Sequence, residues 1–249
     1  MTTWLPPGTT KTMFVVRADP APLGSAGLRA GLADAGALRV QLNVDDEHVA
    51  PALRLATSAP VSAVLSVWVD PARDPAGVSA LVTAAVGAAS GWVVDERRRL
   101  DPAERYDGAR AEELANVAVL RRPAELDRET WLHRWLVEHT GVAIRTQATS
   151  GYVQNICTAP LGAPDPADER VEALVEELFP AAAAHDVHAF YGSGGDDAEL
   201  GRRLEQLMTS VARIGADRDL DLVPSSRHLW DLADPPGLSR ERPATASSR

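Results

Sequence analysis

The sequence predicts an α+β fold built from two consecutive units of the same kind. Short apolar segments rich in β-branched residues alternate with segments in which apolar residues have helical spacing. The order strand, helix, strand, strand, helix, strand occurs twice along the 249 residues, with one helix added in the second copy. Because 45% of the residues are apolar and 24% are charged, the chain has enough apolar surface for a large core, which excludes disorder over its whole length.

The first unit is expected to cover residues 11–100. Its strands are short apolar segments bounded by turn residues, such as the Asp-Pro pair that closes the third strand. Its helices start at the capping residues Ser25 and Asp74 and end at Gly36 and Gly91. The expected strands are 12–18, 38–44, 61–69 and 91–95.

The second unit is expected to cover residues 115–230. Asp127 and Asp197 cap the starts of its two main helices. Segment 168–178 is interpreted as the added helix because four of its apolar residues have helical spacing: Val171, Leu174, Val175 and Leu178. The expected strands are 116–120, 151–157, 187–191 and 220–230.

This order of elements is that of the ferredoxin-like unit, a four-stranded antiparallel sheet with two helices on one face. A single unit leaves the other face of its sheet bare, whereas two units can cover these faces together and form a barrel-like core. A short echo supports the duplication: Val40–Asn43 reads VQLN and Val153–Asn155 reads VQN, both in the second strand of their unit. The charged segment 101–114 is then a connector, and the Pro- and Ser-rich tail 231–249 is expected to be disordered.

Charge and composition exclude several classes of partner. The formal net charge of −10 argues against binding nucleic acid, whose phosphates need Lys and Arg. No run approaches the roughly 18 apolar residues of a membrane span, and the first residues lack the features of a signal peptide. The single cysteine, Cys157, has no partner for an intrachain disulfide. A cytoplasmic chain with no membrane partner is therefore expected.

Several positions of the second unit resemble a known family. A strand leads into Arg121-Arg122-Pro123, a Trp-rich helix ends in His139, and a Tyr-x-x-Asn strand follows at Tyr152–Asn155. This pattern, spanning roughly residues 115–230, resembles the EthD-like proteins of the dimeric α/β-barrel superfamily. One departure is the segment Thr140-Gly141-Val142 after the histidine, where the family often has Gly-Pro.

The resemblance implies both a fold and a function. The fold would be two ferredoxin-like β-α-β-β-α-β repeats in one chain, with their antiparallel sheets packed as an intrachain dimeric α/β barrel. The function would be to bind or transform a small hydrophobic organic molecule by cofactor-independent acid–base chemistry, in an oxidative catabolic or polyketide-type pathway. A non-catalytic accessory or ligand-binding protein that supports an oxygenase system is the alternative. Either a monomer with a pseudo-dimeric barrel or a homodimer fits.

His139 is the leading candidate for catalysis. In a regular helix Trp135 and His139 share an apolar face, at whose end an imidazole could titrate near neutral pH and move a proton. His228, on the last strand, could meet it across a pocket. The structural alternative is a histidine at the edge of the core that bonds to a backbone carbonyl.

Five further residues are candidates for binding substrate. Alternation along the strand puts Tyr152 and Gln154 on one face and Asn155 on the other, so one set must be structural. Trp135 could form an aromatic wall for an apolar ligand, or pack in the core. Tyr191 is expected on a strand beside the same pocket.

Other polar clusters have simpler interpretations. His185 and His188 have i, i+3 spacing with Asp186 between them, but no second Cys and no His-Glu-x-x-His motif supports a zinc site, so no metal site is expected. The glycine run 192–195 lacks the Lys-Ser/Thr ending of a phosphate loop. Glu176 and Glu177 are interpreted as a solvated face.

Overall fold

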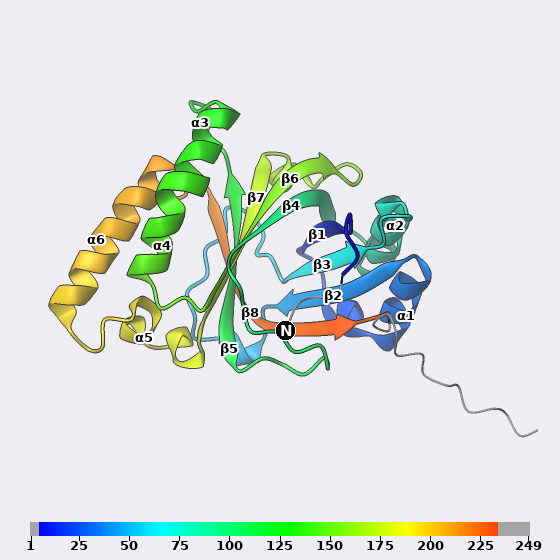
Figure 1. The fold of residues 1–249 in the computed structure, drawn as a ribbon, viewed down its shortest axis with the longest axis horizontal. Helices are drawn as coiled ribbons and strands as arrows, with labels where there is room; N and C mark the ends of the chain where they lie inside the picture. Colours follow the sequence, from blue (N-terminus) through cyan, green and yellow to red (C-terminus); the bar gives the residue numbers. More distant parts are fainter. Residues whose placement is uncertain (1–4, 234–249) are drawn as a thin grey trace, which may run out of the picture.

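The computed structural model describes residues 5–233, so the expected tail lies outside the described residues from position 234 onward. Eight antiparallel strands close into a barrel in the order β1-β3-β2-β8-β5-β7-β6-β4 (Figure 1). The strands are β1 (Thr10–Val16), β2 (Ala37–Val44), β3 (Ala63–Val69), β4 (Ser90–Leu100), β5 (Glu113–Arg121), β6 (Gly151–Pro160), β7 (Val171–Pro180) and β8 (Leu220–Asp231).

The barrel consists of two four-stranded halves with the same strand order. The first half runs β4-β1-β3-β2 and the second runs β8-β5-β7-β6, which confirms two ferredoxin-like repeats in one chain. The halves join along two antiparallel seams, where β2 pairs with β8 and β4 pairs with β6. Because these seams close the barrel within the chain, no sheet edge is left for a second copy to cover. Pairing of whole chains into a homodimer stays a prediction.

Each half carries its helices on the outer face of its sheet. Helices α1 (Ala26–Asp34) and α2 (Pro75–Val86) cover the first half. The second half is covered by α3 (Arg128–His133), a π-helical turn η3 (Arg134–His139), α4 (Thr140–Thr146) and α6 (Asp197–Arg213) (Figure 1). The shorter helices are η1 (Ala21–Gly24), η2 (Glu47–Val49), η4 (Pro166–Asp168), η5 (Ala181–Ala184) and α5 (Val187–Tyr191).

Side-chain caps fix where the main helices begin. The Ser25 hydroxyl accepts a hydrogen bond from Leu28 N–H, and the Asp127 carboxylate accepts one from Thr130 N–H. Asp74 and Asp196 cap α2 and α6 in the same way. These caps satisfy N–H groups that have no partner within the helix, so the helix starts predicted from the sequence agree with the structure to within one residue.

Two predicted elements are wrong. Segment 168–178 is not a helix but contains most of strand β7, and segment 187–191 is not a strand but helix α5. Strand β7 is buried on both faces, with Leu174 in the barrel and Val175 under the helices, so its apolar residues do not alternate. Because the apolar residues of this segment do not alternate with polar ones, their spacing in the sequence matches the period of a helix. Helix α5 begins because Asp186 caps the N–H groups of His188 and Ala189.

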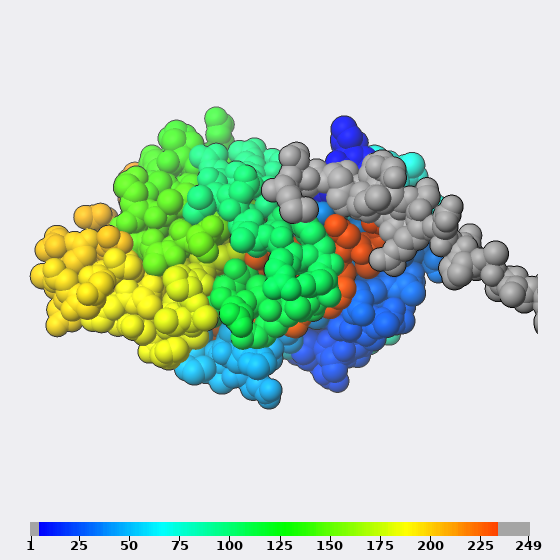
Figure 2. Space-filling view, turned by 60° about the horizontal axis from the view of Figure 1, so that its bottom comes forward, coloured from blue at the N-terminus to red at the C-terminus, as the bar shows by residue number. Residues whose placement is uncertain are grey.

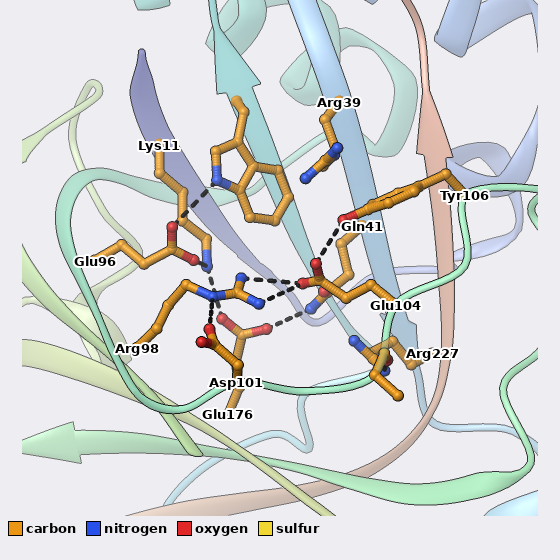
Figure 3. A network of polar contacts seen from close by, with 12 residues as sticks. Lys11, Arg39, Gln41, Glu96, Arg98, Asp101, Glu104, Tyr106, Glu176 and Arg227 are labelled. Carbon is orange, nitrogen blue, oxygen red and sulfur yellow. Dashed lines mark hydrogen bonds and ion pairs between the residues drawn. The ribbon is translucent and has the colours of Figure 1, made fainter. Parts of the chain in front are cut away.

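The barrel interior is apolar in its middle and carries buried charges at both ends. At one end, Arg121 forms ion pairs with Asp168 and Asp221. The other end, which we call the polar end, holds a buried ion pair between Lys11 Nζ and Glu176 Oε1 at 2.7 Å, and Lys11 also contacts Glu96 at 2.9 Å (Figure 3). Gln41 and Asn155 donate further hydrogen bonds to the Glu176 carboxylate. The expectation that Glu176 belongs to a solvated face is therefore wrong, because its partners come from strands of both halves.

The connector between the halves lies across the polar end of the barrel (Figure 3). Glu104 accepts two hydrogen bonds from Arg98, each 3.0 Å long, and one from the Tyr106 hydroxyl. The Arg39 guanidinium lies 3.8 Å from the centre of the Tyr106 ring. The connector thus covers the interior network. In the described part of the chain, none of the helices is long and apolar enough to cross a membrane.

Candidate functional site

A cavity of about 220 Å³ lies between the sheet of the second half and the helices that cover it. Its floor is made by strands β5 to β8, and its roof by the π-helical turn η3 and helices α5 and α6. Most of its surface is apolar. The polar or aromatic residues that line it are Asn116, Trp135, His139, Gln147, Tyr152, Glu177, Phe190, Tyr191 and Asp217.

The corresponding layer of the first half is filled. Thirteen buried apolar residues pack there as one cluster between the sheet and helices α1 and α2, among them Phe14, Leu32, Leu65 and Val78. In the first copy the layer between sheet and helices is filled by this cluster, whereas in the second copy the same layer contains the cavity and its polar groups. A separate open depression of about 710 Å³ lies beside α2 and the segment between β6 and β7.

The first half nevertheless contributes to the mouth of the cavity. Leu53 and Leu55 lie in the segment between η2 and β3, and both line the cavity of the second half. Leu55 exchanges two backbone hydrogen bonds with Leu222 of β8, which holds the segment in place. Figure 2 shows this light-blue segment against the yellow surface of η5 and α5, whose residue Val187 lines a neighbouring depression with Leu53.

A π-helical turn places two of the predicted residues in the cavity. Trp135 and His139 both lie in η3 and both line the cavity, and the Trp135 ring stacks on Trp131 at 5.4 Å. The Trp135 carbonyl accepts hydrogen bonds from the backbone N–H and the hydroxyl of Thr140, five residues later. Such wide turns within a helix occur often at functional sites.

His139 is buried, with 7% of its surface exposed, and its Nδ1 lies 2.9 Å from the Ser210 hydroxyl. Burial lowers the pKa of His139 to about 4. The imidazole is therefore neutral at pH 7, and the expectation that it titrates near neutrality is wrong. A neutral imidazole in this position is suited to donate or accept a hydrogen bond while it orients a ligand.

Glu177 is the ionisable group of the cavity that the sequence analysis missed. It is 8% exposed, and within the described residues its carboxylate has neither a hydrogen bond nor an ion pair. Burial alone raises its pKa to about 7. The interpretation of Glu177 as part of a solvated face followed from the wrong assignment of β7. Once 171–180 is known to be a strand, alternation places Glu177 beside Val175, on the face under the helices.

Two tyrosines line the cavity beside this carboxylate. Tyr152 is fully buried on β6, and Tyr191 is half-buried at the end of α5. Burial raises the pKa of both hydroxyls, and the charge of Glu177 adds to the increase in each case. Both phenols therefore stay protonated at neutral pH and keep an O–H group to donate.

Two side-chain amides in the cavity lining have oxygens without partners. Asn116 Oδ1 and Gln147 Oε1 are buried and make no hydrogen bond to any described residue. Buried polar atoms of this kind are uncommon, because each costs about 1–3 kcal/mol when its hydrogen bond is missing. Both oxygens belong to residues that line the cavity, which has room for a hydrogen-bond partner.

Three residues predicted for the site lie elsewhere. Gln154 faces the helices but donates its hydrogen bond to Thr140 Oγ1 at 2.9 Å and does not line the cavity. Asn155 faces the barrel interior, where it donates to Glu176. His228 bonds to the Gly108 carbonyl at 3.0 Å and is likewise absent from the cavity lining.

The histidines considered for a metal do not form a site. His188 Nδ1 lies 2.6 Å from the Ser193 hydroxyl, which places its ring at the turn after α5. Across residues 5–233, no group of three His, Cys, Asp or Glu side chains is arranged to hold a metal ion. The ionisable groups of the cavity lining are two carboxylates, Glu177 and the exposed Asp217, one neutral imidazole and two phenols.

A solved structure shares this architecture. An anthrone oxidase-like protein superposes with a TM-score of 0.55 at 9% sequence identity, over 94% of this chain and 97% of its own. The chain has the dimeric α/β-barrel fold. A protein proposed to be a monooxygenase, from Lactobacillus acidophilus NCFM, gives a TM-score of 0.45 at 10% identity, over 91% of this chain and 97% of its own. A mutant chlorite dismutase from Candidatus Nitrospira defluvii gives a TM-score of 0.46 at 11% sequence identity, over 90% of this chain and 92% of its own.

No family model matches the sequence, and no curated protein matches it. The dimeric α/β-barrel fold is therefore shown by the three-dimensional structure and not by sequence similarity. The function has to be argued from the residues of the cavity.

Proposed function

We propose that this dimeric α/β barrel is a diverged EthD-like protein that binds a small hydrophobic organic molecule in the second-half cavity and transforms it by proton transfer. The observation that carries the proposal is the Glu177 carboxylate, which lines an apolar cavity without a partner among the described residues. A buried carboxylate that serves only stability has hydrogen bonds or a cation beside it.

The protonation states of the cavity residues at neutral pH indicate which residue accepts a proton and which residues orient the ligand. A general base works best when its pKa lies near the operating pH, and burial brings the pKa of Glu177 to about 7. His139 and Tyr152 are neutral at this pH, so they can hold and orient an oxygen or nitrogen atom of the ligand. Glu177 would accept the proton, which replaces His139 as the proposed base.

The size of the cavity limits the ligand. An apolar cavity of about 150 Å³ is large enough to hold benzene. The 220 Å³ cavity therefore suits a molecule of one or two rings. Apolar residues such as Leu120, Leu207 and Val211 surround most of it, which favours a hydrophobic ring system with few polar substituents.

Two tryptophan substitutions on α6 test the site. Met208 and Leu204 are similarly exposed, at 44% and 40%, but only Met208 lines the cavity. We expect Met208→Trp to weaken the binding of 1-naphthalenemethanol at least tenfold in calorimetry, because the indole occupies the mouth. Leu204→Trp serves as the matched control and should leave the affinity unchanged. Equal affinities for all three proteins would place the ligand elsewhere.

The accessory role remains the second candidate because of the apolar rim. Leu53, Leu55, Val187 and Met208 are exposed around the cavity mouth, with 67%, 42%, 50% and 44% of their surfaces accessible. Such a patch fits a protein that passes its ligand to a partner. Mass spectrometry of ligand recovered after incubation separates the two functions, because an enzyme changes its substrate whereas a carrier returns it intact.

A further inference from the structure

The charged side chains that line the cavity are all acidic. The lining contains Glu177 and Asp217 but no Lys or Arg. His139 adds no positive charge, because burial lowers its pKa to about 4. The unsatisfied amide atoms, Asn116 Oδ1 and Gln147 Oε1, are both hydrogen-bond acceptors, whereas the unsatisfied Trp135 Nε1–H is a donor. The two amide oxygens and the carboxylate therefore call for hydrogen-bond donors, and the carboxylate also calls for a positive charge.

A cation beside Glu177 would also lie near the amide of Asn116, because Asn116 and Glu177 are directly paired across β5 and β7. A carboxylate in apolar surroundings is stabilised strongly by an opposite charge at contact distance, because little solvent screens the pair. A protonated amine carries two or three N–H donors beside its charge, which fits the neighbouring acceptors. A hydroxyl offers one donor and no charge, so it leaves the carboxylate uncompensated.

The aromatic residues favour the same kind of ligand. Trp135, Tyr152, Phe190 and Tyr191 all line the cavity with Glu177. The face of an aromatic ring attracts an ammonium group, and the attraction is stronger where water is excluded. The net charge of −10 adds a long-range attraction for cations over the whole surface.

We propose that the cavity binds a hydrophobic amine of one or two rings as its ammonium ion, with the charged nitrogen paired to Glu177 and the rings among the aromatic side chains. This inference rests on the proposed function, namely that a small molecule occupies this cavity. It goes further by assigning the chemical class of the ligand and the residue that selects it.

The pairing predicts a characteristic dependence on pH. The ionisable groups around Glu177 are Tyr152 of β6, Tyr191 of α5, His139 of η3 and the exposed Asp217, while Arg99 of β4 acts on Tyr152 from outside. Between pH 5.5 and 8 the phenols and the imidazole keep their neutral forms. Since the pKa of Glu177 is about 7 in the free protein, an ammonium ion must displace a proton below that pH.

The experiment uses two ligands of the same shape. We expect 1-naphthylmethylamine to bind the full chain at least tenfold more tightly than 1-naphthalenemethanol at pH 8 in calorimetry. The amine should lose about fivefold in affinity between pH 7 and pH 6, because the ionised fraction of Glu177 falls by about that factor, whereas the affinity for the alcohol should stay constant. Glu177→Gln should remove both the preference and the pH dependence.

A matched control separates specific pairing from general attraction. Glu205 is an exposed carboxylate of α6 outside the cavity lining, so Glu205→Gln should change amine affinity less than threefold. Tight binding of the alcohol without preference for the amine, or an amine affinity unaffected by Glu177→Gln, overturns the amine assignment and leaves the binding cavity standing. Failure of both ligands to bind counts against the proposed function itself.

Discussion

Glu176 and Glu177 are neighbours on β7, and the pleat of the strand sends their side chains to opposite faces of the sheet. Glu176 points into the barrel, where contact with Lys11 holds its pKa below the usual value against the effect of burial. Glu177 points under the helices, where burial is unopposed and its pKa rises to about 7. Two identical side chains thus differ because one has a cation at contact distance and the other does not.

The unpaired carboxylate predicts a pH-dependent stability. The pKa of Glu177 rises from 4.5 to about 7 on folding, so the folded chain binds more protons than the unfolded chain between these values. Its contribution is fully present below pH 4.5 and is lost as the pH rises through 7. The loss amounts to about 3 kcal/mol, at 1.36 kcal/mol per pH unit.

We therefore expect Glu177→Gln to gain about 3 kcal/mol relative to wild type between pH 4.5 and pH 8. Urea unfolding at a series of pH values measures the free energy of unfolding of both proteins. His139 makes a pH-dependent contribution of opposite sign, but it is the same in both proteins and cancels in the difference. Glu205→Gln, an exposed position on α6, is the control and should show no such trend. A constant difference between Glu177→Gln and wild type would contradict the buried, unpaired state of the carboxylate.

Helices and strands are predicted best from the sequence where a single signal, such as an apolar run, a helix cap or a helical period, is clear. Strands β1, β3 and β8 and helices α2 and α6 follow from apolar runs, caps and helical periodicity. Strand β7 does not, because burial on both faces removes its alternation, and the five-residue helix α5 is too short for periodicity to show. The error at β7 also hid Glu177, so a wrong element removed the central residue of the candidate site.

The π-helical turn shows a second limit of sequence patterns. The stripe through Trp135 and His139 assumes a regular helix, and the sequence contains no signal for the wider turn. Both residues nevertheless line the cavity, whereas Gln154, on the face predicted for Tyr152, is held by Thr140. A face can be predicted from alternation, but which residue on it reaches a cavity depends on the helix packed above.

The contact between η3–α4 and β6 can be tested through Thr140. Its hydroxyl bonds to the carbonyls of Trp135 and Leu136 and accepts a hydrogen bond from Gln154, which is fully buried. We expect Thr140→Val to cost about 1–3 kcal/mol, because the Gln154 amide loses its partner. Chemical denaturation measures the loss, and the double variant Thr140→Val, Gln154→Leu should recover part of it.

The same pair distinguishes structure from ligand binding. If Gln154 serves only to join helix and sheet, the double variant should bind 1-naphthalenemethanol like wild type. A loss of binding without loss of stability would instead support the role in substrate binding predicted for Gln154 from the sequence.

At the scale of the whole molecule, the duplication separates stability from function. The first half is packed solid between sheet and helices, and the second half contains the cavity. Neither half is complete, because its outer strands pair with the other half along the seams β2–β8 and β4–β6. The ion pair between Lys11 of the first half and Glu176 of the second lies inside the barrel, so the halves also share their core.

Cutting the connector tests whether the seams alone hold the barrel together. We propose inserting a protease site after the exposed Ala109 and comparing cut with uncut protein. The two pieces should stay associated in size-exclusion chromatography, because both seams and the shared core remain. The thermal midpoint of the cut protein should be lower and should rise with protein concentration, since folding now includes association. The uncut protein should show no dependence on concentration. Two separately folded pieces would mean that each half closes its own sheet, contrary to the shared barrel.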